Sequence, residues 1–133
     1  MFQELIDSYA KNPVNNHIME NATIDHHEGN SLCGDDITVY LKITDNKIDA
    51  YSYSGNCSTI TSAAASFLSD IIINENIDDI LSRNYDTMKK NDFVVSPRRK
   101  RAAVIAILAA RNAIHKYKQD NTIDTFDDLL YNE

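Results

Sequence analysis

The first half of the chain contains one helical pattern of apolar residues followed by three strand-like patterns. Apolar positions at helical spacing predict an amphipathic helix over residues 1–11. This helix should end before Pro13, because the residue that precedes a proline avoids the helical conformation. A loose alternation predicts a strand over residues 22–28. A strict alternation over residues 37–44 predicts a second strand, which a turn joins to a third strand over residues 47–53.

The second half is dominated by helical patterns. A largely buried helix is predicted over residues 58–74 and a brief helix over residues 77–81, each with a polar residue able to cap its start. Residues 84–95 are polar and predict an irregular, exposed segment. A proline in the first turn favours a long helix over residues 97–118. Residues 125–131 add a last turn or two of helix.

The composition is typical of one soluble globular domain, which we expect to span residues 1–133. Of 133 residues, 43% are apolar and 25% are charged. With the order of the elements, this predicts an α+β fold in which a small three-stranded antiparallel sheet packs against several helices. The apolar run over residues 102–110 is much shorter than the roughly 20 residues that cross a bilayer, and the acidic start is unlike a signal peptide. We therefore expect a cytoplasmic protein that does not enter a membrane.

The distribution of charge suggests a protein partner and not a nucleic acid. The formal net charge is −7, which opposes binding to phosphate backbones. Four cations are nevertheless consecutive, namely Arg98, Arg99, Lys100 and Arg101. Cations in the first turn of a helix oppose its dipole, so helix stability does not explain them. They indicate a docking surface for an acidic partner, a site for an anionic sulfur species near the cysteine thiols, or a solvated helix end.

Two cysteines and one aspartate are the candidate chemical groups. Cys33 and Asp35 flank a flexible glycine at the start of the predicted hairpin, and Cys57 lies at the start of the helix that follows it. Since the hairpin can bring these points to one edge of the sheet, the three side chains can converge on a zinc or iron ion. The helix N-terminus should also lower the pKa of the Cys57 thiol. The alternatives are a simple turn at Gly34 with Asp35 capping local amides, and a small buried hydrophobe at Cys57.

Several motifs together resemble a known family. They are Ile6-Asp7-Ser8-Tyr9 with Asn12-Pro13 and Asn15, Asn30-Ser31-Leu32-Cys33-Gly34-Asp35, Tyr53-Ser54-Gly55, Ile60-Thr61-Ser62-Ala63-Ala64-Ala65-Ser66, and Pro97-Arg98-Arg99-Lys100. Over nearly the whole chain they are similar to the U-type scaffolds of iron–sulfur cluster assembly, a group that includes IscU, SufU and the amino-terminal part of NifU. The resemblance implies a SufE/NifU-like fold and a scaffold without enzymatic turnover. It also implies sulfur delivered by a cysteine desulfurase and transfer to apo iron–sulfur proteins.

The resemblance implies a site that holds zinc or a transient iron–sulfur cluster on three cysteines and an aspartate, and this chain departs from that pattern. A gap-free alignment puts Ser58 at the position of the family's second cysteine, and alignment of the final helix puts Ala102 at the position of its third cysteine. Cys33, Asp35 and Cys57 remain as the expected ligands.

The incomplete ligand set leaves the function open between two alternatives. A fourth ligand could be water, His26 or His27, or a cysteine lent by the desulfurase. Alternatively, the chain is a metal-free paralogue that binds the desulfurase as a regulatory module. A cysteine hydrolase would need a base near the thiol, and no histidine lies where the motifs predict one.

Overall fold

The computed structural model describes residues 2–30 and 34–130 and contains a sheet covered on one face by helices. The elements are α1 (Phe2–Lys11), β1 (Ile24–Asn30), β2 (Asp35–Thr44), β3 (Lys47–Ser54), α2 (Thr59–Ile72), α3 (Ile77–Ile80), α4 (Tyr85–Lys90), the 3-10 turn η1 (Pro97–Arg99), α5 (Lys100–Lys118) and α6 (Phe126–Leu130). The predicted α+β fold with a three-stranded antiparallel sheet is confirmed.

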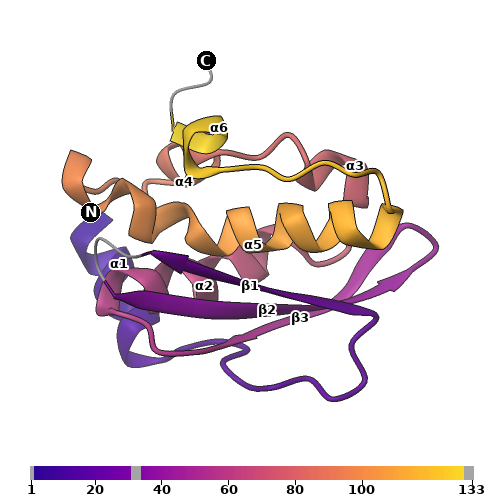
Figure 1. Cartoon of the computed structure of the whole chain (residues 1–133). Coiled ribbons are helices and arrows are strands. Elements are labelled where there is room, and N and C mark those ends of the chain that lie inside the picture. The colour runs from indigo at the N-terminus through magenta and orange to yellow at the C-terminus, as the bar shows by residue number, and fades with distance from the viewer. Residues whose placement is uncertain (1, 31–33, 131–133) are drawn as a thin grey trace.

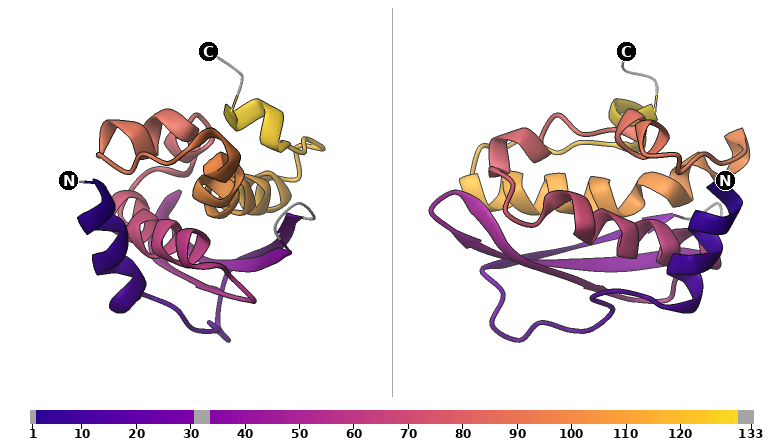
Figure 2. Two further views of the ribbon diagram at one scale, coloured as in Figure 1. Left: turned by 90° about the vertical axis from the view of Figure 1, so that its left-hand side faces the viewer. Right: turned by 180° about the vertical axis from the view of Figure 1, so that it is seen from behind.

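The sheet has the order β1-β2-β3, and both strand pairs are antiparallel. The helices α2 and α5 lie side by side on one face of this sheet, and α1 flanks α2 (Figures 1 and 2). The strict alternation of β2 turns Ile37, Val39 and Leu41 toward these helices, where all three are completely buried. In α2, three small residues, Ala63–Ala65, let the helix approach the sheet so closely that Tyr51 Oη donates to the Ala65 carbonyl at 2.7 Å.

The prediction of an exposed, irregular segment over residues 84–95 is wrong. This segment contains α4, whose start is capped because Asn84 Oδ1 accepts a hydrogen bond from Asp86 N. Met88 and Phe93 are fully buried, and the ring of Phe93 stacks on that of Phe67 with centroids 5.5 Å apart. The apolar residues are too widely spaced to give a clear period, and their burial depends on segments distant in sequence, since Phe93 stacks on Phe67 of α2 and α4 packs on α5.

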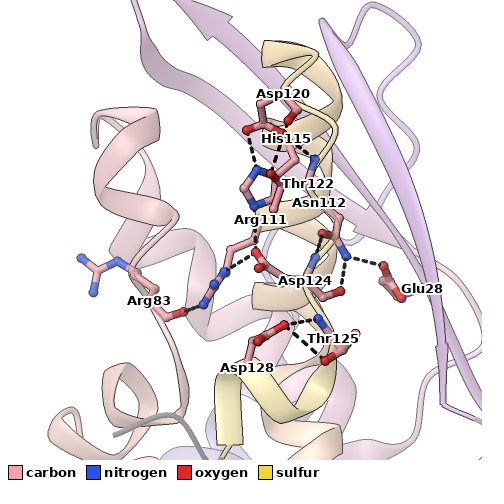
Figure 3. A network of polar contacts seen from close by, with 10 residues as sticks. All are labelled: Glu28, Arg83, Arg111, Asn112, His115, Asp120, Thr122, Asp124, Thr125 and Asp128. Carbon is pink, nitrogen blue, oxygen red and sulfur yellow. Dashed lines mark hydrogen bonds and ion pairs between the residues drawn. The ribbon is translucent and has the colours of Figure 1, made fainter.

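The chain reverses after α5, and a polar network fastens the returning segment to that helix (Figure 3). Asp124 Oδ2 accepts from Arg111 Nε and contacts His115 Nε2, both at 2.9 Å. Asp124 N donates to Asn112 Oδ1 at 2.7 Å, and His115 Nδ1 lies 2.7 Å from Asp120 Oδ2. His115 therefore contacts two carboxylates of the returning segment, one at each ring nitrogen.

The starts of β2, α2 and α5 all lie at one end of the molecule (Figures 1 and 2). The first residues of these three elements, which belong to the motifs in the sequence, therefore lie at the same end.

Within the described residues, no helix is long and apolar enough to cross a membrane.

Candidate functional site

Asp35 is the residue around which the candidate site is built. It is the first residue of β2 and is only 4% exposed. Its Oδ1 accepts a hydrogen bond from the backbone N of Ser58 at 2.7 Å, and its Oδ2 accepts one from Thr61 Oγ1 at 2.7 Å. Both donors lie at the start of α2, where the helix dipole places partial positive charge. The carboxylate is thus fixed against the N-terminus of α2.

Ser58, and not Cys57, is the residue that contacts the Asp35 carboxylate. Ser58 is the N-cap of α2, and its Oγ lies 3.4 Å from Asp35 Oδ2. The Cys57 thiol instead donates to the backbone oxygen of Asp36 at 3.5 Å and is partly buried against the core. This arrangement agrees with the gap-free alignment that puts Ser58 at the second cysteine position.

The surroundings of Cys57 contradict the expectation of a lowered thiol pKa. Burial, and after it the negative charges of Asp35 and Asp36, raise the pKa of Cys57 from 9.0 to about 11. These effects outweigh the lowering of the thiol pKa that the helix N-terminus would cause, because the thiol is directed at a carbonyl oxygen and not at the free amides of α2. A thiol that keeps its proton at neutral pH is a weak nucleophile.

Gly55 allows the connection between β3 and α2 to reach the start of β2. The two segments are close enough there for Asp36 N, on β2, to donate a hydrogen bond to Asn56 O, in the connection, at 3.1 Å. Gly55 has a φ of +137°, and a Cβ added to it would lie 2.3 Å from the Asp36 carbonyl oxygen. No residue with a side chain fits there without a shift of the backbone. Gly55 therefore places Cys57 and Ser58 next to β2.

The ligand set expected from the sequence is only partly brought together. Cys33 lies outside the described residues, and Ala102, in the first turn of α5, is 4% exposed and has no donor atom. Within residues 2–30 and 34–130, no group of three or more His, Cys, Asp or Glu side chains is placed to hold a metal ion. Since a structural zinc site uses four protein ligands, the described donors do not complete one.

The two strand histidines have partners of their own. His26 and His27 point to opposite faces of β1, as adjacent strand residues should. His26 Nε2 lies 2.7 Å from Glu28 Oε2, and His27 Nε2 lies 3.6 Å from Asp36 Oδ1. Each histidine therefore contacts a carboxylate, and the structure shows no contact of either ring with Asp35 or Cys57.

The basic run divides into an exposed half and a packed half. Residues 98–99 form part of η1 and are exposed. Lys100 Nζ lies 4.9 Å from the centroid of the Tyr85 ring, and Arg101 Cζ lies 4.8 Å from that of Phe126, so both cations make cation–π contacts. These contacts give Lys100 and Arg101 a structural role that the sequence did not suggest.

A hollow of about 410 Å³ lies between the basic run and the start of α2. Because Arg99 and the first two residues of α2 both line it, the hollow connects one exposed cation with the N-terminus of α2. The hollow is lined by Gln3, Ile6, Asp7, Thr59, Ile60, Val94, Val95, Ser96 and Arg99.

Comparisons with known proteins agree with the resemblance in sequence. The family model described as NifU-like N terminal domain matches residues 1–124. The iron–sulfur cluster assembly scaffold protein IscU of Thermotoga maritima is 33% identical over 82 residues, which are 62% of this chain. The match spans 58% of the length of that relative.

Solved structures share the fold at low sequence identity. FiSufU of Fervidobacterium islandicum AW-1, a candidate scaffold protein for the SUF system, has a TM-score of 0.74 at 20% identity, with 84% of this chain and 94% of that chain covered. The N-terminal part of a nitrogen-fixing NifU-like protein from Brucella abortus has a TM-score of 0.72 at 17% identity, with 87% and 93% covered. At these identities the likeness establishes the fold alone.

Proposed function

The chain belongs to the NifU-like N-terminal domain family, and from this premise we propose that it is an iron–sulfur cluster assembly scaffold or sulfur acceptor that works with a cysteine desulfurase. It would act in the cytoplasm, without enzymatic turnover of its own, and pass its cargo to apo iron–sulfur proteins. The observation that carries the proposal is the buried Asp35 carboxylate, fixed at the N-terminus of α2 beside Ser58, where the family resemblance puts the cargo site.

Cys33 is the proposed sulfur acceptor, and Cys57 is the less suitable of the two thiols. Cys57 is partly buried and its thiol donates to the carbonyl oxygen of Asp36. In the transfer, the Cys33 sulfur attacks the outer sulfur of a desulfurase persulfide, so that a new S–S bond forms on Cys33. The desulfurase S–S bond breaks, and its cysteine leaves as a thiolate that takes the proton from Cys33. The sulfur of Cys33 is oxidised to a persulfide and the desulfurase cysteine is reduced to a thiol.

The cargo, ferrous iron, zinc or a nascent cluster, would be held weakly. Cys33, Asp35 and Cys57 are the proposed ligands, and Asp35 keeps acceptor capacity because a carboxylate offers about four lone-pair sites. Ser58 and Ala102 supply no thiolate at the two remaining family positions. A cysteine lent by the desulfurase would complete the coordination during transfer and would make loading depend on the partner.

The proposed docking surface for the desulfurase is the basic run with the adjoining hollow. Arg98 and Arg99 are its accessible cations, because Lys100 and Arg101 are packed on aromatic rings. If an acidic surface meets them, association should slow as salt rises, since salt screens exposed charges. Replacing both exposed arginines by glutamine should remove most of this salt dependence. If the association rates of the parent and the double variant fall equally as salt rises, residues 98–99 are only a solvated helix end.

A second candidate function is a metal-free regulatory module that binds the desulfurase, and the absence of a thiol at positions 58 and 102 favours it. The scaffold and the regulatory function are distinguished by measuring bound iron and sulfide after anaerobic incubation with a desulfurase, cysteine and ferrous iron. A scaffold should acquire iron and labile sulfide, and Cys33→Ser should lose both. If the parent and Cys33→Ser both remain free of iron but still bind the desulfurase, the regulatory function is the correct one.

A further inference from the structure

The strand β1 forms a free edge of the sheet. It pairs with β2 on one side, and among the described residues no other segment pairs with its outer side. By contrast, the outer side of β3 is partly covered, because Tyr53 N donates to Asn15 O at 3.0 Å. The left view of Figure 2 shows β1 at the border of the sheet, with no helix or strand beyond it. An unpaired edge of seven residues is a template for pairing with another chain.

The register of the sheet decides which backbone groups of β1 are available for such pairing. Neighbouring residues of a strand direct their backbone groups to opposite sides. Because Tyr53 N donates away from the sheet, its partner Val39 directs its backbone groups toward β1, where it pairs with His26. The backbone groups of His26 therefore face β2, and those of Asp25 and His27 point outward from the edge.

The side chains along β1 suit a second copy of the same strand. In an antiparallel pair of two β1 strands centred on His26, Asp25 of each copy lies opposite His27 of the other. Both side chains are exposed, and a histidine ring can donate to a carboxylate in its neutral or its protonated form. Complementary side chains at facing positions stabilise paired strands, whereas like charges there oppose pairing. The polar side chains that commonly guard an edge strand are therefore matched in this arrangement.

An exposed apolar residue lies beside the same edge. Ile123 is 80% exposed, more than any other large apolar side chain of the described residues. It lines a hollow of about 430 Å³ together with His26, and a second hollow of about 350 Å³ together with residues 28–30. Both hollows therefore border β1 on the side of the sheet that carries α5. Pairing of two β1 strands about His26 puts the two copies of Ile123 on the same side of the joined sheet, where they can cover each other.

We propose that the chain forms a weak symmetric dimer by antiparallel pairing of β1 with β1 of a second copy, which joins the two sheets and covers Ile123. The surface is small, so the association is weak and depends on protein concentration. Asn30, at the end of β1, pairs with Asp35, so antiparallel pairing puts the two candidate sites at opposite ends of the joined sheet. Both sites stay accessible to a desulfurase, and the dimer does not depend on that partnership.

Sedimentation equilibrium across a wide range of protein concentration tests the dimer. The parent should pass from monomer to dimer, and Ile123→Ser should raise the dissociation constant. Asp25→Lys places a cation opposite each His27 and should raise it about tenfold, because two favourable cross-strand pairs are replaced by unfavourable ones. Asp25→Lys with His27→Glu restores opposite charges and should return the dissociation constant close to that of the parent. Asp49→Lys is the matched control, since it makes the same change of charge at an exposed residue of β3.

Amide hydrogen exchange identifies the surface that pairs. The amides of Asp25 and His27 should become protected as the protein concentration rises, because their N–H groups then donate to the second copy. A parent that stays monomeric at every concentration, a dimer in which these amides stay unprotected, or a double variant no tighter than Asp25→Lys would each overturn the proposal. Protection of these amides in a monomer would also overturn it, because a segment of another kind would then cover the edge.

Discussion

Thr61→Val tests the account of how Asp35 is fixed at the candidate site. Thr61 is fully buried, and its Oγ1 donates to Asp35 Oδ2 at 2.7 Å. Valine has nearly the same shape but lacks the hydroxyl, so the substitution removes a donor from a buried carboxylate without opening a cavity. A buried hydrogen bond to a charged group contributes about 1.5–3 kcal/mol. We therefore expect the free energy of unfolding to fall by about 2 kcal/mol.

Urea unfolding followed by circular dichroism gives this free energy directly. In a thermal melt, the same loss should appear as a drop of roughly 6–10 °C in Tm for a domain of this size. Thr61→Ser keeps the donor and should recover most of the loss. Thr59→Val is the matched control, because Thr59 lies two residues earlier, is exposed, and should change stability by less than about 0.5 kcal/mol. If Thr61→Val were as stable as Thr61→Ser, Asp35 would not depend on the hydroxyl and the reasoning would be refuted.

Three further predictions follow from other parts of the structure. Gly55→Ala should lower the free energy of unfolding by about 1–3 kcal/mol, because φ is +137° and the new Cβ would meet the Asp36 carbonyl oxygen. An unchanged urea midpoint would show that residue 55 does not lie tightly against the backbone of β2. The hydrogen bond to Asp70, with some burial, raises the pKa of Tyr9 from 10.0 to about 12, so its contribution to stability should be complete below pH 10 and lost as pH rises toward 12. Comparing the parent with Tyr9→Phe by urea unfolding across this range measures the loss, and a constant difference would contradict it. Ser58→Cys with Ala102→Cys should tighten zinc binding by adding two thiolates; calorimetry that finds no gain would show that these positions do not face the cargo site.

The sequence predicted most of the fold because its signals are local. The alternation of β2, the polar caps at Ser58 and Asn76, and the proline before α5 each act within a few residues, and the structure confirms each of them. The segment with α4 was missed because its burial depends on contacts with residues far away in the sequence, such as that of Phe93 with Phe67, which no local pattern encodes.

The candidate site was predicted in outline but not in its chemistry. The hairpin was expected to bring Asp35 to the start of α2, and it does. The raised pKa of Cys57 depends on burial of the thiol and, after it, on the negative charges of Asp35 and Asp36, which come from another strand. The sequence pattern assigned Thr61 no role of its own; the signal for that role is a hydroxyl three residues after the helix cap, next to a buried carboxylate.

The position of transferred sulfur tests the central claim most directly. The full chain is incubated anaerobically with a cysteine desulfurase and cysteine, alkylated, and analysed by mass spectrometry of its peptides. The account predicts one added sulfur atom on Cys33 and none on Cys57, and unchanged labelling of Cys33 in a Cys57→Ser variant. Sulfur found on Cys57, or on neither cysteine while the desulfurase itself is loaded, would contradict it.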